Sequence, residues 1–362
     1  MTRRLLPIGV VAAVVALIVG GLAFATVPSV DVPTCAKPTG SVSHAKLLAY
    51  IECRSDRIEA LLANQPTETP KDPEPTDPTP TDPPTTDPTD PPATEPPASE
   101  WPGPDNTGVP AGTNLTAYTG PCTITSSITI DAKDVAGKCG ELIVRGNGIT
   151  VDITRSNLPR VENTTFGQFA TINITDSDVS SPTWYEGVIW GANFTVTRAD
   201  ITGGQHSVHC DQGNCTIVDS WLHDQFEDPA KSFHNNAFIA NGGSGYTLRG
   251  NTLHCTADLN SNGGGCTADV SLFGDFSKVS DVLVEGNLMK ANNRSISFCA
   301  YGGYEPSKPH PVSTQIRFID NVFERGANNK CGVYGPVSSF QPTAAGNVWS
   351  GNTWSDGTPL NP

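Results

Sequence analysis

Short stretches of alternating apolar and polar residues recur through the second half of the chain. Residues 194–201, 215–222 and 246–253 share one pattern, in which an alternating run is followed by polar residues, a small residue or Asn, and one more apolar residue. Such a run is typical of a short β-strand that ends in a tight corner. The small or Asn corner position returns at intervals of 21 to 36 residues, at Asn147, Ser177, Ala199, Ser220, Asn251, Asn287, Asn321 and Asn347.

These intervals predict an all-β fold, a single-stranded parallel β-helix of about eight coils. A meander of β-hairpins would instead need turn signals every ~8–12 residues. We expect residues 109–362 to form this domain. We also expect the corner asparagines to point inward as a hydrogen-bonded ladder.

The repeat also predicts which side chains face the interior. Apolar residues stand two positions after each corner, and a second apolar set lies in the alternating runs themselves. The first set is Val179, Ile201, Leu222, Leu253, Met289 and Phe323, and the second is Val144, Ile174, Val196, Ile217, Leu248, Val284 and Phe318. The polar residues that follow the first set should stack on the outside at about 4.8 Å per coil. These are Ser180, Thr202, His223, His254, Lys290 and Glu324.

The first 108 residues have a different character. Residues 1–30 contain two arginines and then a long uncharged run, which fits either a cleaved signal peptide or a retained membrane anchor. Either would export the rest of the chain. Residues 31–65 predict a short amphipathic helix or a short coiled coil. Residues 66–108 predict a disordered, acidic stalk, because 13 prolines and nine acidic residues fall between positions 66 and 100.

Ten cysteines agree with export, because none forms a zinc-type pattern and an even number suits disulfides outside the cytoplasm. Spacing alone does not determine connectivity, and we expect pairing in sequential order. The expected pairs are Cys35–Cys53, Cys122–Cys139, Cys210–Cys215, Cys255–Cys266 and Cys299–Cys331.

The net charge narrows the class of ligand. The chain carries −15 overall, and residues 101–362 carry −9, from 15 basic and 24 acidic residues. Such a domain repels nucleic acid and polyanions. We therefore expect no nucleic-acid partner, a membrane contact only through the N-terminal segment, and a neutral glycan or a Ca²⁺-bridged uronate as ligand.

Three sequence features carry a resemblance to a known family. They are the Gly-Asn corners at 250–251, 286–287 and 346–347, the Trp-Leu-His-Asp run at 221–224 with the stretch 234–243, and the closing run 330–336. On these, residues 109–358 resemble the pectin-lyase-like superfamily, and more narrowly uncharacterised secreted bacterial and phage-tail β-helix repeat proteins. The resemblance implies the right-handed β-helix, and its members include lyases, hydrolases, esterases and adhesins. Many relatives read His-x-Asp-x-Ile-Gln where this chain has Asn236 and Ile239.

Five of the seven histidines fall within residues 206–254, on what should be consecutive coils. Histidine titrates near neutrality and serves as acid, base or hydrogen-bond donor. We expect His209, His223, His234 and His254 to lie on one face, beside a groove walled by the loops after His223 and Cys255. The expected catalytic residues are His209, His223, Asp224, His234 and His254. The expected substrate-binding residues are Asn236, Arg249, Lys290, Trp184 and Tyr301, with no protein-bound metal beyond a possible Ca²⁺.

Two functions follow as hypotheses. The first is a surface-displayed, carbohydrate-active enzyme, either a polysaccharide lyase or a glycoside hydrolase. The histidine cluster favours it, although no carboxylate pair stands out for a hydrolase. The second is a non-catalytic glycan-binding or adhesion module on a stalk, which Asn236 favours. A purely structural spike is a third reading.

Overall fold

The computed structural model describes residues 101–164 and 169–362, and all expectations for residues 1–100 lie outside these described ranges. The described chain contains 28 β-strands in three parallel sheets, which we name A, B and C. Within these ranges, no helix has the length and apolar character needed to cross a membrane. The fold is an all-β parallel β-helix, as the repeat predicts.

Each sheet takes every third strand of the chain. Sheet A contains β1 (Thr116–Ala117), β4 (Lys133–Asp134), β7 (Asn157–Leu158), β10 (Asp178–Ser181), β13 (Asp200–Gly203), β16 (Trp221–His223), β19 (Thr252–Leu253), β22 (Leu288–Met289), β25 (Val322–Phe323) and β28 (Thr353–Trp354). Sheet B contains β2 (Thr123–Ile124), β5 (Glu141–Val144), β8 (Arg160–Asn163), β11 (Gly187–Gly191), β14 (His206–Cys210), β17 (His234–Ala240), β20 (Gly265–Leu272), β23 (Phe298–Gly302) and β26 (Gly335–Ser338). Sheet C contains β3 (Ile128–Asp131), β6 (Thr150–Thr154), β9 (Thr171–Thr175), β12 (Phe194–Thr197), β15 (Cys215–Val218), β18 (Gly243–Arg249), β21 (Val279–Glu285), β24 (Thr314–Ile319) and β27 (Val348–Ser350).

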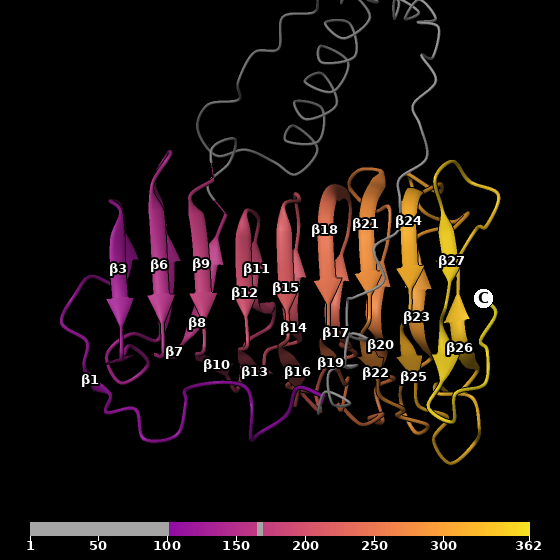
Figure 1. Ribbon diagram of the computed structural model, residues 1–362, viewed down its shortest axis with the longest axis horizontal. Coiled ribbons are helices and arrows are strands. Elements are labelled where there is room, and N and C mark those ends of the chain that lie inside the picture. Colours follow the sequence, from indigo (N-terminus) through magenta and orange to yellow (C-terminus); the bar gives the residue numbers. More distant parts are fainter. Residues whose placement is uncertain (1–100, 165–168) are drawn as a thin grey trace, which may run out of the picture. The chain divides into compact units, whose positions relative to one another are not determined.

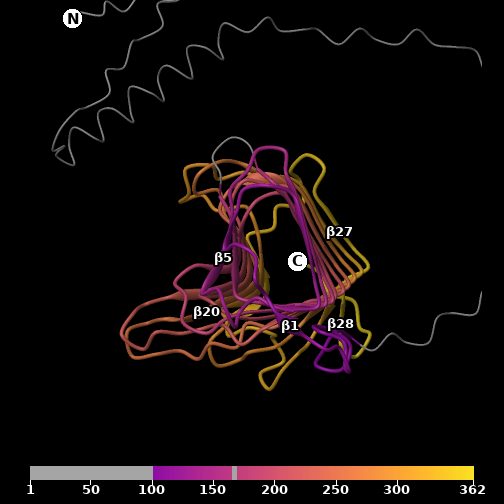
Figure 2. The same ribbon diagram turned by 90° about the vertical axis from the view of Figure 1, so that its left-hand side faces the viewer.

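Every coil runs through sheet C, then sheet A, then sheet B, and neighbouring coils pair in parallel (Figure 1). Seen along the solenoid axis, the sheets form three walls, and the connections from sheet A to sheet B project at one corner (Figure 2). Strands β3 to β26 form eight complete coils, as the repeat predicts, and two further strands stand at each end of the solenoid.

The interior is a set of apolar stacks, as alternation in a strand requires. Every residue predicted for the core is buried, and the stack in sheet A follows the expected register from Val179 through Ile201 to Phe323. Val144 is the one member assigned to the wrong stack, because it lies in sheet B, and Ile153 of sheet C pairs with Ile174 instead.

A ladder of buried polar side chains runs along the corner between sheets C and A. The Asn251 amide nitrogen donates to the Asn287 oxygen at 2.9 Å, and Asn287 donates in the same way to Asn321 at 2.9 Å. Each of these side chains also accepts the backbone N–H of the preceding coil's corner residue. The residue before the corner adopts a positive φ, for example +67° at Gly250 and +60° at Gly286, which explains the Gly-Asn pairs.

Two predicted members of the ladder are wrong. Asn147 is exposed and Asn347 is half-buried, and both lie in connections from sheet B to sheet C. The ladder positions in those coils are Ser156 and Asn352; the Asn321 amide donates to the Asn352 oxygen at 2.8 Å. The misassignment arose because a Gly-Asn pair also suits an ordinary loop turn.

Four of the predicted disulfides form: Cys122–Cys139, Cys210–Cys215, Cys255–Cys266 and Cys299–Cys331. No cysteine in the described ranges is free. Cys35 and Cys53 lie outside them. The Cys299–Cys331 bond joins β23 to the connection that follows β25, so it links successive coils.

Residues 101–109 form a strap on the outer face of sheet A. The sequence assigns positions up to 108 to the stalk, but Gly108 donates its N–H to the Arg198 carbonyl and Val109 donates to Asp178. Figure 1 shows the strap in purple, on the side of the solenoid that carries β10, β13 and β16. Residues 101–108 therefore pack on the β-helix instead of belonging to the stalk.

Candidate functional site

The outer face of sheet B carries one column of side chains in successive coils. Strand pairing places Trp190 next to His209, His209 next to Ile239, Ile239 next to Ser271, and Ser271 next to Tyr301. Neighbours in the column are about 4.8 Å apart, because that is the distance between paired strands. Long connections flank this face on both sides, for example residues 224–233 and 273–278.

A break in the strand alternation of β14 brings two histidines together. Ser207 and Val208 are consecutive and both fully buried, so the outward side resumes at His209 rather than at Val208. His206 and His209 therefore share the outer side although they are three residues apart, and their ring centroids lie 5.4 Å from each other. A regular strand would place residues at this spacing on opposite faces.

His209 is held between two carboxylates. Its Nδ1 lies 3.0 Å from Glu186 Oε2, and its Nε2 lies 2.6 Å from Asp211 Oδ1. The other Asp211 oxygen accepts the Trp190 indole N–H at 2.5 Å. Gly187 makes room for this arrangement, because a Cβ there would lie 2.8 Å from the His209 backbone nitrogen. We call Glu186, His209 and Asp211 the charged triad.

The two histidines differ in protonation. Burial alone would lower the pKa of His209, but the hydrogen bonds that its ring donates to the Asp211 and Glu186 carboxylates outweigh burial and raise the pKa to about 9. Burial lowers the pKa of His206 well below its ordinary value, and the nearby His209 and His234 add to this. At neutral pH the pair is thus one imidazolium and one neutral imidazole.

Asn236 connects this pair to the next coils. Its amide nitrogen donates to the His234 carbonyl at 2.9 Å and lies 3.2 Å from His206 Nδ1, while its oxygen accepts the Ser271 hydroxyl at 2.5 Å. The side chain is buried and fully hydrogen-bonded, so it acts on His206 by fixing the position of the ring. The His234 ring is exposed and contacts Thr267.

A buried arginine adjoins the triad on the preceding coil. Arg160 forms ion pairs with Glu141 at 2.9 Å and with Glu162 at 2.8 Å. Its guanidinium carbon lies 4.6 Å from the centroid of the Trp184 ring and 5.0 Å from the centroid of the Trp190 ring. These cation–π contacts hold the two indoles beside the triad. Trp184 remains 37% exposed, so one part of its ring is open to a ligand.

Later coils add aromatic rings to the same face. Tyr301 contacts Phe273 at 5.2 Å and Phe298 at 5.5 Å between centroids, and Phe298 contacts Tyr334 at 5.9 Å. Tyr334 is exposed. The outer face of sheet B therefore combines a charged centre with aromatic surface on both sides of it along the solenoid axis.

A second group of predicted residues lies on sheet A. His223 is buried, its Nε2 lies 2.8 Å from Asp200, its Nδ1 lies 2.9 Å from Asp224, and its ring stacks on Trp221 at 3.4 Å. His254 follows in the next coil, as the register predicts, because its N–H donates to the Leu222 carbonyl. Burial, and then Lys290, lowers the pKa of His254.

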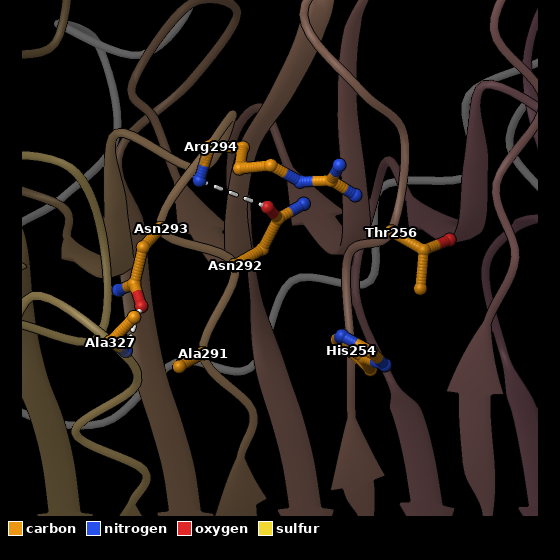
Figure 3. A pocket seen from close by; sticks show the side chains of 7 residues that line it. All are labelled: His254, Thr256, Ala291, Asn292, Asn293, Arg294 and Ala327. Carbon is orange, nitrogen blue, oxygen red and sulfur yellow. Dashed lines mark hydrogen bonds between the residues drawn. The ribbon is translucent and has the colours of Figure 1, made fainter.

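Two hollows of about 440 Å³ each meet at His254. One lies between the strap and sheet A and is lined by Trp101 and Trp221, with Lys290 and Glu324 at its edge. The other is formed by the loops between sheets A and B (Figure 3). In Figure 3 Asn292 and Arg294 lie across the hollow from His254, and Asn293 is bonded to the Ala327 N–H. Lys290 itself is paired with Glu324 at 2.8 Å.

The prediction of a single histidine face is therefore wrong. His209, His234, Asn236 and Tyr301 belong to sheet B, whereas His223, Asp224, His254 and Lys290 belong to sheet A. Trp184 lies in the connection before β11 and joins the sheet B group through Arg160. Arg249 lies on sheet C and pairs with Glu285 at 2.7 Å, remote from both groups.

Five residues of the sheet B group are not among the predicted site residues: Arg160, Glu186, Trp190, His206 and Asp211. His206 belonged to the histidine cluster, but its spacing from His209 argues against a shared face in a regular strand. Asp211 appears in the sequence only as one of several acidic residues. Nothing in the local sequence links Glu186 or Arg160 to the histidines, because each comes from a different coil.

Comparison with protein-family models, with curated proteins and with solved structures finds no match for this chain. The site must therefore be interpreted from its own geometry.

Proposed function

We propose that this chain is an exported, surface-displayed, carbohydrate-active protein that acts on an extended glycan along the outer face of sheet B. The supporting observation is the column of side chains along sheet B, in which the partly exposed Trp190 and Tyr301 stand at either end of the buried His209, Ile239 and Ser271. A repeat of about 4.8 Å along the solenoid is close to the length of one sugar unit, so a linear glycan that follows the column from Trp190 to Tyr301 would place about one sugar on each coil. Aromatic rings suit the apolar faces of sugars.

The charged triad is the reactive centre in this proposal. Hydrolysis of a glycosidic bond uses two carboxyl groups on either side of the bond, one as an acid and one as a base or nucleophile. Glu186 and Asp211 lie on opposite ring nitrogens of His209, and their side chains are 44% and 23% exposed. For a lyase, a carboxylate would act as the base and the imidazolium of His209 would neutralise developing negative charge.

Export and display are part of the same proposal. Four disulfides in one domain favour an oxidising compartment. The apolar run at residues 1–30 would direct or anchor the chain, and the proline-rich segment would hold the solenoid away from the surface. Within this proposal the β-helix is right-handed and of the pectin-lyase-like type.

A second candidate function is glycan binding without reaction. One observation favours it: both His209 ring nitrogens, both Asp211 oxygens and both polar atoms of Asn236 are already bonded within the protein. A fully bonded network can serve as a rigid polar surface for a bound sugar.

The decisive experiment is an assay of the full-length chain on neutral and uronate-containing polysaccharides, scored for new reducing ends and for unsaturated uronates. Glu186→Gln and Asp211→Asn should each lower the rate by at least about 10²-fold if these carboxylates act as acid or base. In a pure binder no product forms, and Tyr301→Ala should weaken glycan affinity by about 1–2 kcal/mol.

Asp200→Asn provides the matched control, because Asp200 pairs with a histidine in the same way on sheet A. It should keep wild-type activity. If Asp200→Asn abolishes activity while the triad variants retain it, the reaction belongs to sheet A. If no glycan binds or reacts, the proposal fails.

A further inference from the structure

We propose that Glu186, His206 and His209 bind a divalent transition-metal ion, for which Zn²⁺ is the probe. One ligand atom of each residue lies within 4.8 Å of the other two. Two imidazole nitrogens and one carboxylate oxygen form a donor set that Zn²⁺ accepts in proteins, with a fourth position left for another ligand.

The backbone holds these three donors before any ion arrives. The buried pair Ser207–Val208 turns both histidines outward, and Glu186 reaches them from the connection before β11. The histidines are 5% and 6% exposed, whereas the Glu186 side chain is 44% exposed. The nitrogen donors are thus fixed by packing, and the carboxylate stands at the solvent side, where an ion would enter.

The surroundings of the histidines also resemble those of metal ligands. A metal-bound histidine usually donates its second ring N–H to a carboxylate or carbonyl, which orients the ring. Asp211 accepts from His209 Nε2 at 2.6 Å, and this leaves Nδ1 directed at Glu186. The Asn236 amide nitrogen lies 3.2 Å from Nδ1 of His206, so Nε2 is the ring nitrogen left for the ion, and ion binding releases its proton.

The donor set selects among ions. Ca²⁺ takes oxygen ligands, so a site with two imidazoles suits Zn²⁺ and related ions instead. The charges of Glu186 and Asp211 offset the two positive charges of the ion. The other described cluster of potential donors, Asp269 with Cys299 and Cys331, offers no comparable site because the two sulfurs are bonded to each other.

This inference goes beyond the proposed glycan activity and is tested without a glycan. The full-length chain, freed of metal with a chelator, is titrated with Zn²⁺ by calorimetry and, in parallel, with Co²⁺ by visible absorption. The site should bind one ion per chain and produce Co²⁺ bands that nitrogen ligation explains. Ca²⁺ should not compete for the site.

Glu186→Gln, His206→Gln and His209→Gln should each weaken this binding event by at least the roughly 10–100-fold typical of losing an outer-shell partner. Glu186→Gln carries the most weight, because its half-exposed side chain can change without unfolding the coil. His223→Gln and His254→Gln on sheet A should leave the affinity unchanged. Zn²⁺ binding that survives all three ligand changes, or Ca²⁺ that competes equally, would overturn the assignment, whatever the glycan assays show.

Discussion

The pKa of one carboxyl group, that of Asp269, is set by its burial inside the solenoid. Asp269 is completely buried, and one of its oxygens accepts the Cys255 N–H at 2.8 Å. The other oxygen has no partner among the described residues. Burial raises the pKa of this carboxyl well above its usual range. The folded chain therefore keeps a proton that the unfolded chain releases near pH 4.

We predict that Asp269→Asn stabilises the protein, and more so at higher pH. The wild-type stability should fall as pH rises from about 4 toward the folded-state pKa, because only the unfolded chain ionises in this range. The amide keeps the acceptor for Cys255 and cannot ionise. The gain should be near zero at pH 4 and on the order of 1–3 kcal/mol at pH 8, measured as the free energy of unfolding in denaturant. A gain that does not vary with pH would contradict this account.

At the scale of a secondary-structure element, the corner ladder determines where sheet C ends and sheet A begins. Each ladder side chain bonds both neighbouring coils, and each corner needs a positive φ just before it. This combination explains why Gly-Asn recurs; in the earlier coils Ser177 and Ser220 accept the same backbone N–H, and Ala199 occupies the position without a side-chain bond.

We predict that Asn287→Ala destabilises the protein by roughly 3 kcal/mol or more. The change removes the acceptor for Asn251 and the donor to the Leu248 carbonyl, and each buried group left unpaired costs about 1–3 kcal/mol. Thermal or denaturant unfolding of the full-length chain measures the loss. Asn147→Ala is the control; it removes an exposed loop amide and should change stability by less than about 0.5 kcal/mol. Equal losses in both variants would refute the assigned ladder.

Much of this element-level structure follows from the sequence, because it depends on local repetition. The apolar stacks through Ile201 and Leu248 and the order of Asn251, Asn287 and Asn321 come directly from the period of the repeat. The shared orientation of His206 and His209 does not follow from the sequence. It depends on a break in strand alternation at Ser207–Val208, and the residue types at these positions do not predict that break. Glu186 meets His209 only through coil stacking, so distance along the chain conceals it, whereas Asp211 is two residues from His209 but is one of many acidic residues in the sequence.

At the scale of the whole molecule, disulfides and coil stacking stabilise different parts of the solenoid. Cys299–Cys331 spans 32 residues and joins successive coils, whereas Cys210–Cys215 spans five residues within one turn. A bond that closes a longer loop restricts the unfolded chain more. The coils themselves interact only with their neighbours, so a cross-link between coils also couples their unfolding.

We predict that replacing both Cys299 and Cys331 with Ala costs ~4 kcal/mol, against ~2 kcal/mol for the Cys210 and Cys215 pair. Denaturant unfolding of the two double variants under the same conditions gives the comparison. The Cys299 and Cys331 variant should also unfold in a broader transition, because its C-terminal coils open separately. The reverse order of stability would show that loop length does not govern these bonds.

The strap has a mechanical consequence. Tension applied at Trp101 would act on the contacts with sheet A before it acts on β1. Gly108 is hydrogen-bonded to Arg198, between β12 and β13, and Val109 is hydrogen-bonded to Asp178 of β10. These contacts would open one at a time, as in peeling, and the first strand would carry load only after they had broken. Gly108 has a φ of +77°, and a Cβ there would overlap the Asp178 carboxylate, so the attachment of the strap depends on this glycine. A sudden pull at Trp101 is therefore resisted first by the contacts between the strap and sheet A. The terminal coil that begins with β1 is protected from fraying.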